Sequence, residues 1–356
     1  MKTNSYKINL DNSNHTFVIA EAGSNWKIGS FSKNLRQAKK LIDIAKKCGA
    51  DAVKFQTYRS NSVYVHNAGK SSYLSKFGIH SKITEIFDEY SMPYKMIQHL
   101  HVYCKKKKIV FMSTAFSVND AMEVNKYVPL HKVASYELNH IPLLEFLAKT
   151  RKPIILSTGA STIEEIDFAI QTIKKNGNNK LALLQCTASY PTPVESLNLA
   201  VISELKQRYR IPVGLSDHST DPFVAPLVAI GFGATIIEKH FTLSRKLKGP
   251  DHFFALEPHE LSLMIKAIRH ADKAKGIKTK QIIDDEKELS KFAKRSIQAI
   301  KNIEKGEKLR IGYNINLLRP GKQRRGEEAR FLYKINGKKA LHKIKLGRGI
   351  KFIDCK

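Results

Sequence analysis

The stretch IPVGLSDHSTDPFVAPLVAIGFGATIIEKH (211–240) decides the fold. It begins with one short β-branched run, 211–215, and ends on another, 234–239, with a helix-length segment between them. The same alternation of short apolar runs and helical patterns extends outward, from residue 15 to residue 274. Such alternation is typical of βαβ units and a parallel sheet.

Short β-branched or apolar runs mark the expected strands, at 16–21, 51–56, 109–113, 131–135, 153–157, 181–186, 211–215 and 234–239. Between them lie amphipathic stretches, in which residues such as Ala38, Leu41 and Ala45 would form one apolar stripe facing a sheet. Eight strands in strict alternation with helices predict a (β/α)8 TIM barrel rather than an open sheet. The longest interruption, 58–92, is predicted to be a loop over the barrel mouth.

The chain of 356 residues is longer than the roughly 250 residues of one such barrel. We therefore expect a barrel domain at 1–274, a charged linker with a short helix at 275–295, and a small β-rich module at 296–356. That module has short β-like runs punctuated by glycines. Because so small a module can bury little core of its own, it is expected to need a packing surface.

The formal net charge of +29 raises the possibility of nucleic-acid binding. The charge is spread along the chain and many lysines lie in helical pairs, so we expect no nucleic-acid partner but a basic field that attracts anionic substrates. No apolar run approaches the ~20 residues of a membrane span, and the first residues lack a secretory signal pattern. A cytoplasmic protein without a membrane partner is expected. The four cysteines form no C-x-x-C pair and are predicted to be reduced.

Reactive groups in a (β/α)8 barrel lie at the C-terminal ends of the strands. A single Ser or Thr at such an end is usually a turn or helix cap, but here every predicted strand delivers polar groups to the same rim. These residues are Glu21, Lys54, Gln56, Ser113, Thr114, Lys132, Ser135, Glu137, Ser157, Thr158, Cys186, Thr187, Tyr190, Ser216, Asp217, His218, Glu238, Lys239 and His240.

Two histidines are candidates for a metal site. His218 and His240 follow neighbouring strands of the predicted barrel, so their imidazoles can face one another. With the carboxylates of Glu21, Glu238 and Asp251 nearby, they suit a divalent ion with nitrogen and oxygen ligands. Mn²⁺ or Mg²⁺ fits this set better than structural Zn²⁺, because no thiolate partner is expected and the site must stay open to substrate.

Two lysines predict an anion site. Lys54 and Lys132 fall on the second and fourth strands, where they would line the barrel together with Ser135, Ser157 and Thr158. Two ammonium groups and several hydroxyls can hold a phosphate on a small substrate. The chain has neither a P-loop nor a G-x-G-x-x-G after a strand, so nucleotide phosphates are not expected.

Nine ordered motifs resemble the sialic acid synthase family, which includes N-acetylneuraminate, legionaminate, pseudaminate and spore-coat polysaccharide synthases. They are AEAGSNW (20–26), GADAVKFQTY (49–58), FMSTAFS (111–117), KVASYE (132–137), KPIILSTGAS (152–161), QCTASYPTP (185–193), GLSDHS (214–219), IIEKHFT (236–242) and GPDH (249–252). The run LLRPGKQ (317–323) is similar to the family's C-terminal antifreeze-like (SAF) domain. The resemblance implies a domain-swapped homodimer, in which this domain of one subunit covers the barrel mouth of the other.

The resemblance also implies roles for individual residues. His218 and His240 would bind the metal and, with Glu21, form the catalytic group. Phosphoenolpyruvate would be held by Lys54, Thr114, Lys132, Ser135, Ser157 and Ser216. The sugar would be contacted by Gln56, Phe116, Glu137, Tyr190, Glu238, Asp251, Phe292 and Arg319.

The implied function is condensation of phosphoenolpyruvate with an N-acetylmannosamine-like sugar, giving a nonulosonic acid and phosphate. Alternatives are another phosphoenolpyruvate or aldol condensation, a synthase for a 6-phosphorylated hexosamine, or a non-catalytic sugar-binding homologue. Trp26, Tyr136 and Ala188 stand where the family usually has other residues. We expect Trp26 and Tyr136 to reshape the sugar pocket, so that the acceptor is bulkier or more apolar than N-acetylmannosamine.

Overall fold

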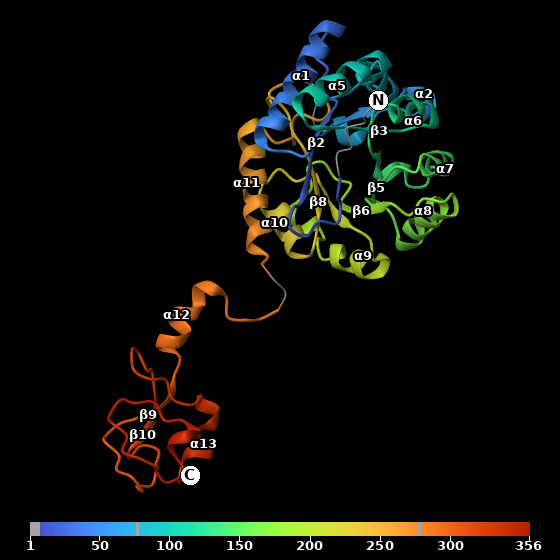
Figure 1. Cartoon of the computed structure of the whole chain (residues 1–356). Helices are drawn as coiled ribbons and strands as arrows, with labels where there is room; N and C mark the ends of the chain where they lie inside the picture. Colours follow the sequence, from blue (N-terminus) through green and yellow to red (C-terminus); the bar gives the residue numbers. More distant parts are fainter. Residues whose placement is uncertain (1–7, 76–77, 277–278) are drawn as a thin grey trace. The chain divides into compact units, whose positions relative to one another are not determined.

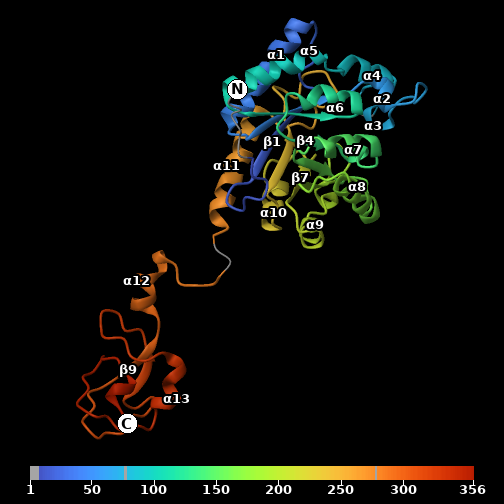
Figure 2. The ribbon, with the colours of Figure 1, turned by 45° about the vertical axis from the view of Figure 1, so that its right-hand side comes forward.

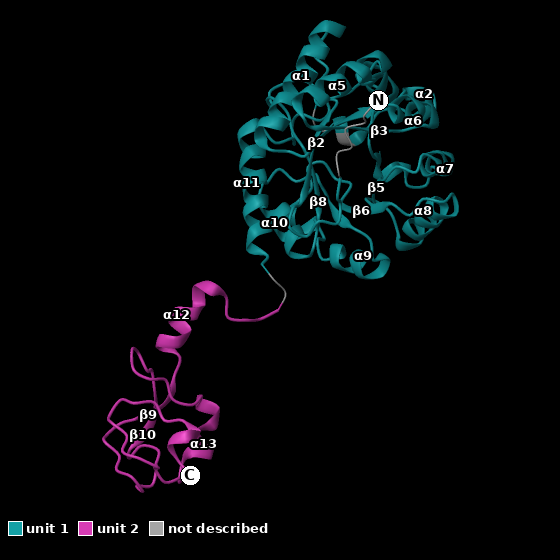
Figure 3. Ribbon diagram, viewed as in Figure 1, with its two compact units in different colours: residues 1–276 teal, residues 277–356 magenta. Residues whose placement is uncertain are grey.

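The protein has two compact units, residues 1–276 and 277–356 (Figure 3). The structure, a computed structural model, describes residues 8–75, 78–276 and 279–356. Part of the expected linker, residues 277–278, therefore lies outside the described residues. None of the described helices combines the length and apolar character needed to cross a bilayer.

The first unit is built on a closed parallel barrel whose strands follow one another in sequence order (Figure 1). The described strands are β1 (Phe17–Gly23), β2 (Ala52–Thr57), β3 (Val110–Ala115), β4 (His131–Val133), β5 (Ile154–Ser157), β6 (Leu181–Cys186), β7 (Val213–Asp217) and β8 (Ile236–His240). The closing pair is β1 with β8, in which Glu21 lies beside His240. The prediction of a (β/α)8 barrel is confirmed, with strand ends shifted by about two residues or less.

Helices cover the outside of the barrel, and α7 packs beside α8 (Figure 2). The main helices are α1 (Phe31–Cys48), α5 (Tyr94–Lys107), α6 (Val118–Asn125), α7 (Ile141–Lys149), α8 (Ile163–Lys175), α9 (Val201–Tyr209), α10 (Val224–Gly231) and α11 (Pro258–Ala274). In α1 the buried face includes Ala38, Leu41 and Ala45, as the apolar spacing predicts. The helix ends where Gly49 adopts φ 93°, a left-handed conformation that glycine reaches without strain.

The segment 58–92 is not the simple loop that was expected. It contains three short helices: α2 (Ser60–Val63), α3 (Ser72–Ser75) and α4 (Ile83–Tyr90). Leu74, Ile83 and Ile86 bury a small apolar cluster of their own. In the described part of this segment, the three helices follow one another without a strand between them, so the segment interrupts the βα alternation. Their apolar cluster is separate from the barrel core.

Alternation of side chains along the strands explains where the chemistry lies. Inward positions at the N-terminal half of the barrel are apolar, and examples are Ile19 on β1 and Ile236 on β8. Two residues further along the same strands, the inward positions become Glu21 and Glu238. Since successive strand residues point to opposite faces, the barrel changes from an apolar core to a charged end along its axis.

The C-terminal unit is small and β-rich. β9 (Ser296–Ala299) pairs antiparallel with β10 (Ile315–Leu318), α13 spans Leu332–Ile335, and further contacts are isolated bridges such as Ile303 with Ile344. The expectation that this unit buries little core is wrong, because it has its own apolar cluster: Ile297, Ala299, Ile303, Leu309, Ile315, Leu332, Ile335, Ala340, Ile344, Ile350 and Cys355. Helix α12 (Asp284–Ala293), within the predicted linker, buries none of its residues.

Candidate active site

A cavity of about 60 Å³ lies at the C-terminal end of the barrel. All nine predicted catalytic and phosphoenolpyruvate-binding residues line it, together with four of the predicted sugar contacts. The full lining is Glu21, Lys54, Gln56, Thr114, Phe116, Lys132, Ala134, Ser135, Ser157, Cys186, Tyr190, Ser216, His218, Glu238 and His240. The parallel register brings these groups together, with Glu21 beside Lys54 and Thr114 beside Lys132.

Two lysines and two carboxylates form a buried charge cluster on the cavity wall. Lys54 Nζ lies 2.7 Å from Glu21 Oε2 and 3.5 Å from Glu238 Oε1. Lys132 Nζ lies 3.9 Å from the same oxygen of Glu238. Glu238 therefore sits between both ammonium groups, and an anion that enters the cavity meets two cations held close together.

Hydrogen bonds fix the rotamers of these lysines. Lys132 Nζ donates to Ser157 Oγ at 2.7 Å, and Lys54 Nζ donates to Thr114 Oγ1 at 2.9 Å. On the other side, Gln56 Nε2 donates to Glu21 Oε1 at 2.9 Å. The ammonium groups are thus preorganised, which lowers the reorganisation cost of holding an anion.

Burial and neighbouring charges shift the proton affinities of the cluster. Burial raises the pKa of Glu21 to about 7, against the opposing attraction of Lys54. Burial alone would also raise the pKa of Glu238, but Lys132 and Lys54 hold it below its usual value. Burial lowers the pKa of Lys132. Two adjacent carboxylates thus differ, since Glu238 is ionised while Glu21 can take or release a proton near neutral pH.

The two predicted metal ligands lie together beside this cluster. The ring centroids of His218 and His240 are 5.7 Å apart. His218 Nδ1 lies 3.0 Å from the Thr187 carbonyl oxygen, to which it donates, so in the neutral form of this ring Nε2 carries the lone pair. Burial holds the pKa of His240 well below its usual value, so this ring is neutral at pH 7. Burial alone would lower the pKa of His218, but the neighbouring Cys186 and the Thr187 carbonyl hold it above its usual value, so this ring must give up a proton to bind a metal.

The donor set fits a divalent ion in part. Two buried atoms on β8, His240 Nδ1 and Glu238 Oε2, have no hydrogen-bond partner, a costly state for the free protein that a bound cation would relieve. Over the described ranges, no set of three or more His, Cys, Asp or Glu side chains is grouped to hold a metal ion. The described residues therefore offer two imidazoles, and the carboxylates of Glu21, Glu238 and Asp251 that were expected nearby do not complete a metal-binding set with them.

Four predicted sugar contacts do not line the cavity. Glu137 is buried in the short helix η1 (Ser135–Glu137) that follows β4. Asp251 accepts hydrogen bonds from the backbone N–H and hydroxyl of Ser24, both at 2.8 Å, and so ties down the loop after β1. Phe292 is on α12, and Arg319 is exposed directly after β10, so both belong to the C-terminal unit.

Glu137→Gln is expected to stabilise the protein at alkaline pH. Burial raises the pKa of Glu137 from 4.5 to about 7, so the folded state holds this proton more tightly than the unfolded chain. Its stabilising contribution is complete below pH 4.5 and is lost as the pH rises through 7. Glutamine keeps the neutral form, so the variant should gain about 1–3 kcal/mol over wild type at pH 8 and little at pH 5.

Urea unfolding at both pH values measures this difference. Glu89→Gln, on the exposed side of α4, is the matched control and should leave the wild-type pH dependence in place. A Glu137→Gln protein with the same stability profile as wild type would show that Glu137 is ionised in the fold.

None of the three departures from the family motifs lines the cavity. Trp26 is 1% exposed and packs in the core between barrel and helices, so the prediction that it reshapes the sugar pocket is wrong. Tyr136 is 62% exposed and follows β4 beside Ser135, which does line the cavity. Ala188 lines a neighbouring groove. The prediction that Tyr136 shapes the sugar pocket stays a prediction, because Tyr136 adjoins a cavity residue in sequence but does not itself line the cavity.

Sequence reasoning gave no role to two residues that touch the site. Cys186, at the end of β6, lines the cavity, and its Sγ lies 3.9 Å from His218 Nδ1. The ring of Phe254 lies 4.9 Å from that of His240 and 5.4 Å from that of Tyr190. The Gln-Cys-Thr motif signalled Cys186, whereas Phe254 lies outside every quoted motif.

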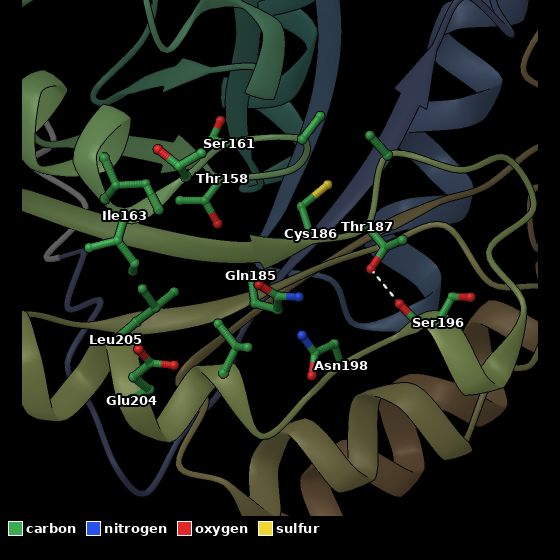
Figure 4. A pocket seen from close by; sticks show the side chains of 15 residues that line it. Thr158, Ser161, Ile163, Gln185, Cys186, Thr187, Ser196, Asn198, Glu204 and Leu205 are labelled. Atoms are coloured by element: carbon green, nitrogen blue, oxygen red, sulfur yellow. Dashed lines mark hydrogen bonds between the residues drawn. The ribbon is translucent and has the colours of Figure 1, made fainter.

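A groove of about 680 Å³ runs beside the site, between the start of α8 and the start of α9 (Figure 4). Thr187 Oγ1 donates to the Ser196 carbonyl at 2.8 Å across it. Its apolar wall includes Ile163 and Leu205, and its one charged lining residue is Glu204. Although the groove is larger, it has no cation for an anionic substrate, so the smaller cavity is the candidate active site.

Comparison with known proteins places the chain in a family. The NeuB family matches residues 41–280. The spore coat polysaccharide biosynthesis protein SpsE of Bacillus subtilis is 37% identical over 354 residues, covering 95% of this chain and 93% of that protein. Pseudaminic acid synthase of Campylobacter jejuni is 34% identical over 346 residues, covering 96% and 97%.

A solved structure extends the comparison. The N-acetylneuraminic acid synthetase of Leptospira borgpetersenii, in complex with citrate, is similar with a TM-score of 0.71 and 31% identity, covering 81% of this chain and 95% of that one. The resemblance of the nine motifs to the sialic acid synthase family is therefore confirmed, whereas the likeness of 317–323 to the antifreeze-like domain stays a prediction. The chain belongs to the NeuB family, a family of sugar-acid synthases.

Proposed function

We propose that the protein condenses phosphoenolpyruvate with an N-acetylated amino sugar to give a nonulosonic acid and phosphate. The observation that carries the proposal is the placement of Lys54 and Lys132 on either side of Glu238, in one cavity with His218 and His240. Phosphoenolpyruvate is small and multiply anionic, which suits two preorganised ammonium groups. The sugar-acid names of the relatives agree with this chemistry.

The residues of the cavity have distinct tasks in this proposal. Lys54 and Lys132 hold the phosphate, and the hydroxyls of Thr114, Ser135, Ser157 and Ser216 hold the phosphate and carboxylate oxygens. C3 of phosphoenolpyruvate forms a bond to the aldehyde carbon of the open-chain sugar. Water then adds at C2, and the C2–O bond breaks to release phosphate.

Glu21 is the group proposed to move protons, because burial places its pKa near 7 within reach of the reacting carbons. His218 and His240 would hold Mn²⁺ or Mg²⁺, which when bound supplies Lewis-acid polarisation of the sugar aldehyde. Tyr190 and Phe116 give the cavity an aromatic rim suited to the apolar parts of an acetylated sugar. A preference for a bulkier or more apolar acceptor now rests on Tyr136.

A phosphate-release assay with phosphoenolpyruvate, Mn²⁺ and a panel of sugars tests the proposal. The panel contains N-acetylmannosamine, its 6-phosphate and 2,4-diacetamido-trideoxyhexoses. Release that depends on both the sugar and Mn²⁺ is expected, with a diacetamido sugar preferred. Release with the 6-phosphate alone would support the phosphorylated-sugar alternative, and no release with any sugar would support a non-catalytic binding protein.

A homodimer that places the C-terminal unit of one subunit over the barrel of the other is also proposed. Support comes from α12, which buries none of its residues and leaves two apolar side chains, those of Leu289 and Phe292, 62% and 46% exposed. An apolar helix surface of this kind usually packs against another surface. A cytoplasmic location is proposed with it, because phosphoenolpyruvate is a cytoplasmic metabolite.

Mixing two inactive variants should restore activity if Arg319 acts on the partner's barrel. Arg319→Ala lacks the sugar contact and His218→Ala lacks a metal ligand, so each homodimer should be inactive. A swapped heterodimer has one site with both residues, and turnover should return to a fraction of wild type after subunit exchange. No recovery, with heterodimers shown by mass spectrometry, would mean that Arg319 serves its own barrel or no site.

A further inference from the structure

Lys239 is a buried cation outside the proposed machinery. It lies on β8 directly before His240 and is 1% exposed. Because His240 points into the cavity, alternation along the strand turns Lys239 outward, toward the layer between barrel and helices. Its register partner on β7 is Asp217, which directly precedes His218.

The Lys239 ammonium forms hydrogen bonds with several groups at the end of β7 and in the loop that follows it. Its Nζ donates to Asp217 Oδ2 at 2.5 Å, to the Ser219 carbonyl at 2.6 Å, and to Ser219 Oγ and the Asp221 carbonyl at 3.1 Å. Asp217 Oδ1 in turn accepts from the Ser219 backbone N–H at 2.8 Å. The residues on both sides of His218 are therefore bonded to one side chain.

We propose that Lys239, paired with Asp217, is a positioning residue that fixes the backbone of His218 so that its imidazole stays opposite His240. The inference rests on the proposed metal role of the two histidines. The Thr187 carbonyl determines which nitrogen of His218 carries the proton. Lys239 determines the position of the backbone from which the His218 ring extends. Groups that orient metal ligands in this way commonly change metal affinity by about 10–100-fold when they are removed.

Stability alone does not account for this ion pair. Replacing a buried ion pair by apolar residues of similar size is often neutral or stabilising, so a core position has no need of a lysine. Two of the four acceptors around Lys239 are carbonyls of the loop, which an apolar side chain could not bind. The arrangement therefore serves the shape of the loop that carries His218.

The test uses the full-length protein with Lys239 and Asp217 replaced together, as Asp217→Asn with Lys239→Met. The double variant removes both charges at once and leaves no unpaired ion in the interior. Asp217→Asn alone keeps an acceptor oxygen for Lys239 Nζ but removes its counter-ion, so it separates the loss of charge from the loss of the hydrogen bonds. The control is Asp272→Asn, since Asp272 is also buried but accepts from Thr16 at the opposite end of the barrel.

Two readouts are measured on each variant. Hydrogen exchange of the metal-free protein reports the order of residues 217–221, and titration with Mn²⁺ alone reports affinity. The double variant should exchange at least about tenfold faster in this loop and bind Mn²⁺ about 10–100-fold more weakly, with a smaller change for Asp217→Asn. Asp272→Asn should lose stability but keep wild-type Mn²⁺ affinity.

The outcomes separate this inference from the proposed function. A folded double variant with unchanged loop exchange and unchanged Mn²⁺ affinity overturns the inference, as does an unchanged Asp217→Asn if the double variant does not fold. If wild type binds no Mn²⁺, the metal role in the proposed function fails. Loop exchange then decides alone whether Lys239 positions His218.

Discussion

Replacing His218 by alanine is expected to abolish turnover while the barrel stays folded. His218 lines the cavity and stands opposite His240, so its loss leaves one imidazole at the proposed metal site. Mn²⁺ affinity should fall by at least about 100-fold, because a direct ligand matters more than the groups that orient it. Mn²⁺ titration and phosphate release with phosphoenolpyruvate and sugar measure the two effects.

His259→Ala is the matched control, because His259 is exposed at the start of α11 and lies away from the cavity. It should keep wild-type activity and wild-type Mn²⁺ affinity. Wild-type turnover by His218→Ala, after chelation and return of Mn²⁺, would show that the metal assignment is wrong.

Lys132→Met should reduce kcat/KM for phosphoenolpyruvate by about 10³-fold or more, since removing one preorganised charge stabiliser commonly costs 10²–10³-fold and Lys132 contacts a full negative charge. The fold should tolerate the change, because Glu238 keeps Lys54 as a partner at 3.5 Å. Methionine preserves the apolar stem that fills the barrel. Steady-state kinetics with varied phosphoenolpyruvate at saturating sugar measure the loss.

The control for this variant is Lys149→Met, at the exposed end of α7. It removes the same charge from the surface, so it distinguishes a local contact from the general attraction of a basic protein for anions. Equal losses in both variants would indicate that the field of the whole protein, rather than Lys132 itself, binds phosphoenolpyruvate.

The barrel and most of the site could be predicted from the sequence because strand periodicity carries both. Apolar runs end on Glu21, Lys54 and His240, and a side-chain repeat of two places these residues inward once the barrel closes. The residues that form the cavity could therefore be identified from the positions at which the strands end.

Loop side chains could not be assigned in the same way. Trp26 follows a strand end as closely as the cavity residues do, yet the turn after β1 directs it into the core between barrel and helices. Asp251 accepts a hydrogen bond from the Ser24 backbone N–H and so holds that turn in place. The periodicity of the sequence does not predict a contact of this kind. Where a loop side chain points depends on tertiary packing that short motifs do not encode.

The C-terminal unit shows a second limit of sequence reasoning. Its core residues, such as Ile303, Leu309 and Ile344, are spaced irregularly because turns and isolated bridges, rather than long strands, bring them together. Neither a period of two nor one of 3.6 detects such a core. Size alone therefore led to an underestimate of how much this unit buries.

The most direct test of the proposed function is mass spectrometry of the product formed from phosphoenolpyruvate labelled with ¹⁸O in the bridging C–O–P position. The account predicts a sugar acid heavier than the acceptor by the mass of unlabelled pyruvate, with the ¹⁸O in the released phosphate, because the C2–O bond breaks. Release of labelled pyruvate, with the sugar unchanged in mass, would contradict it.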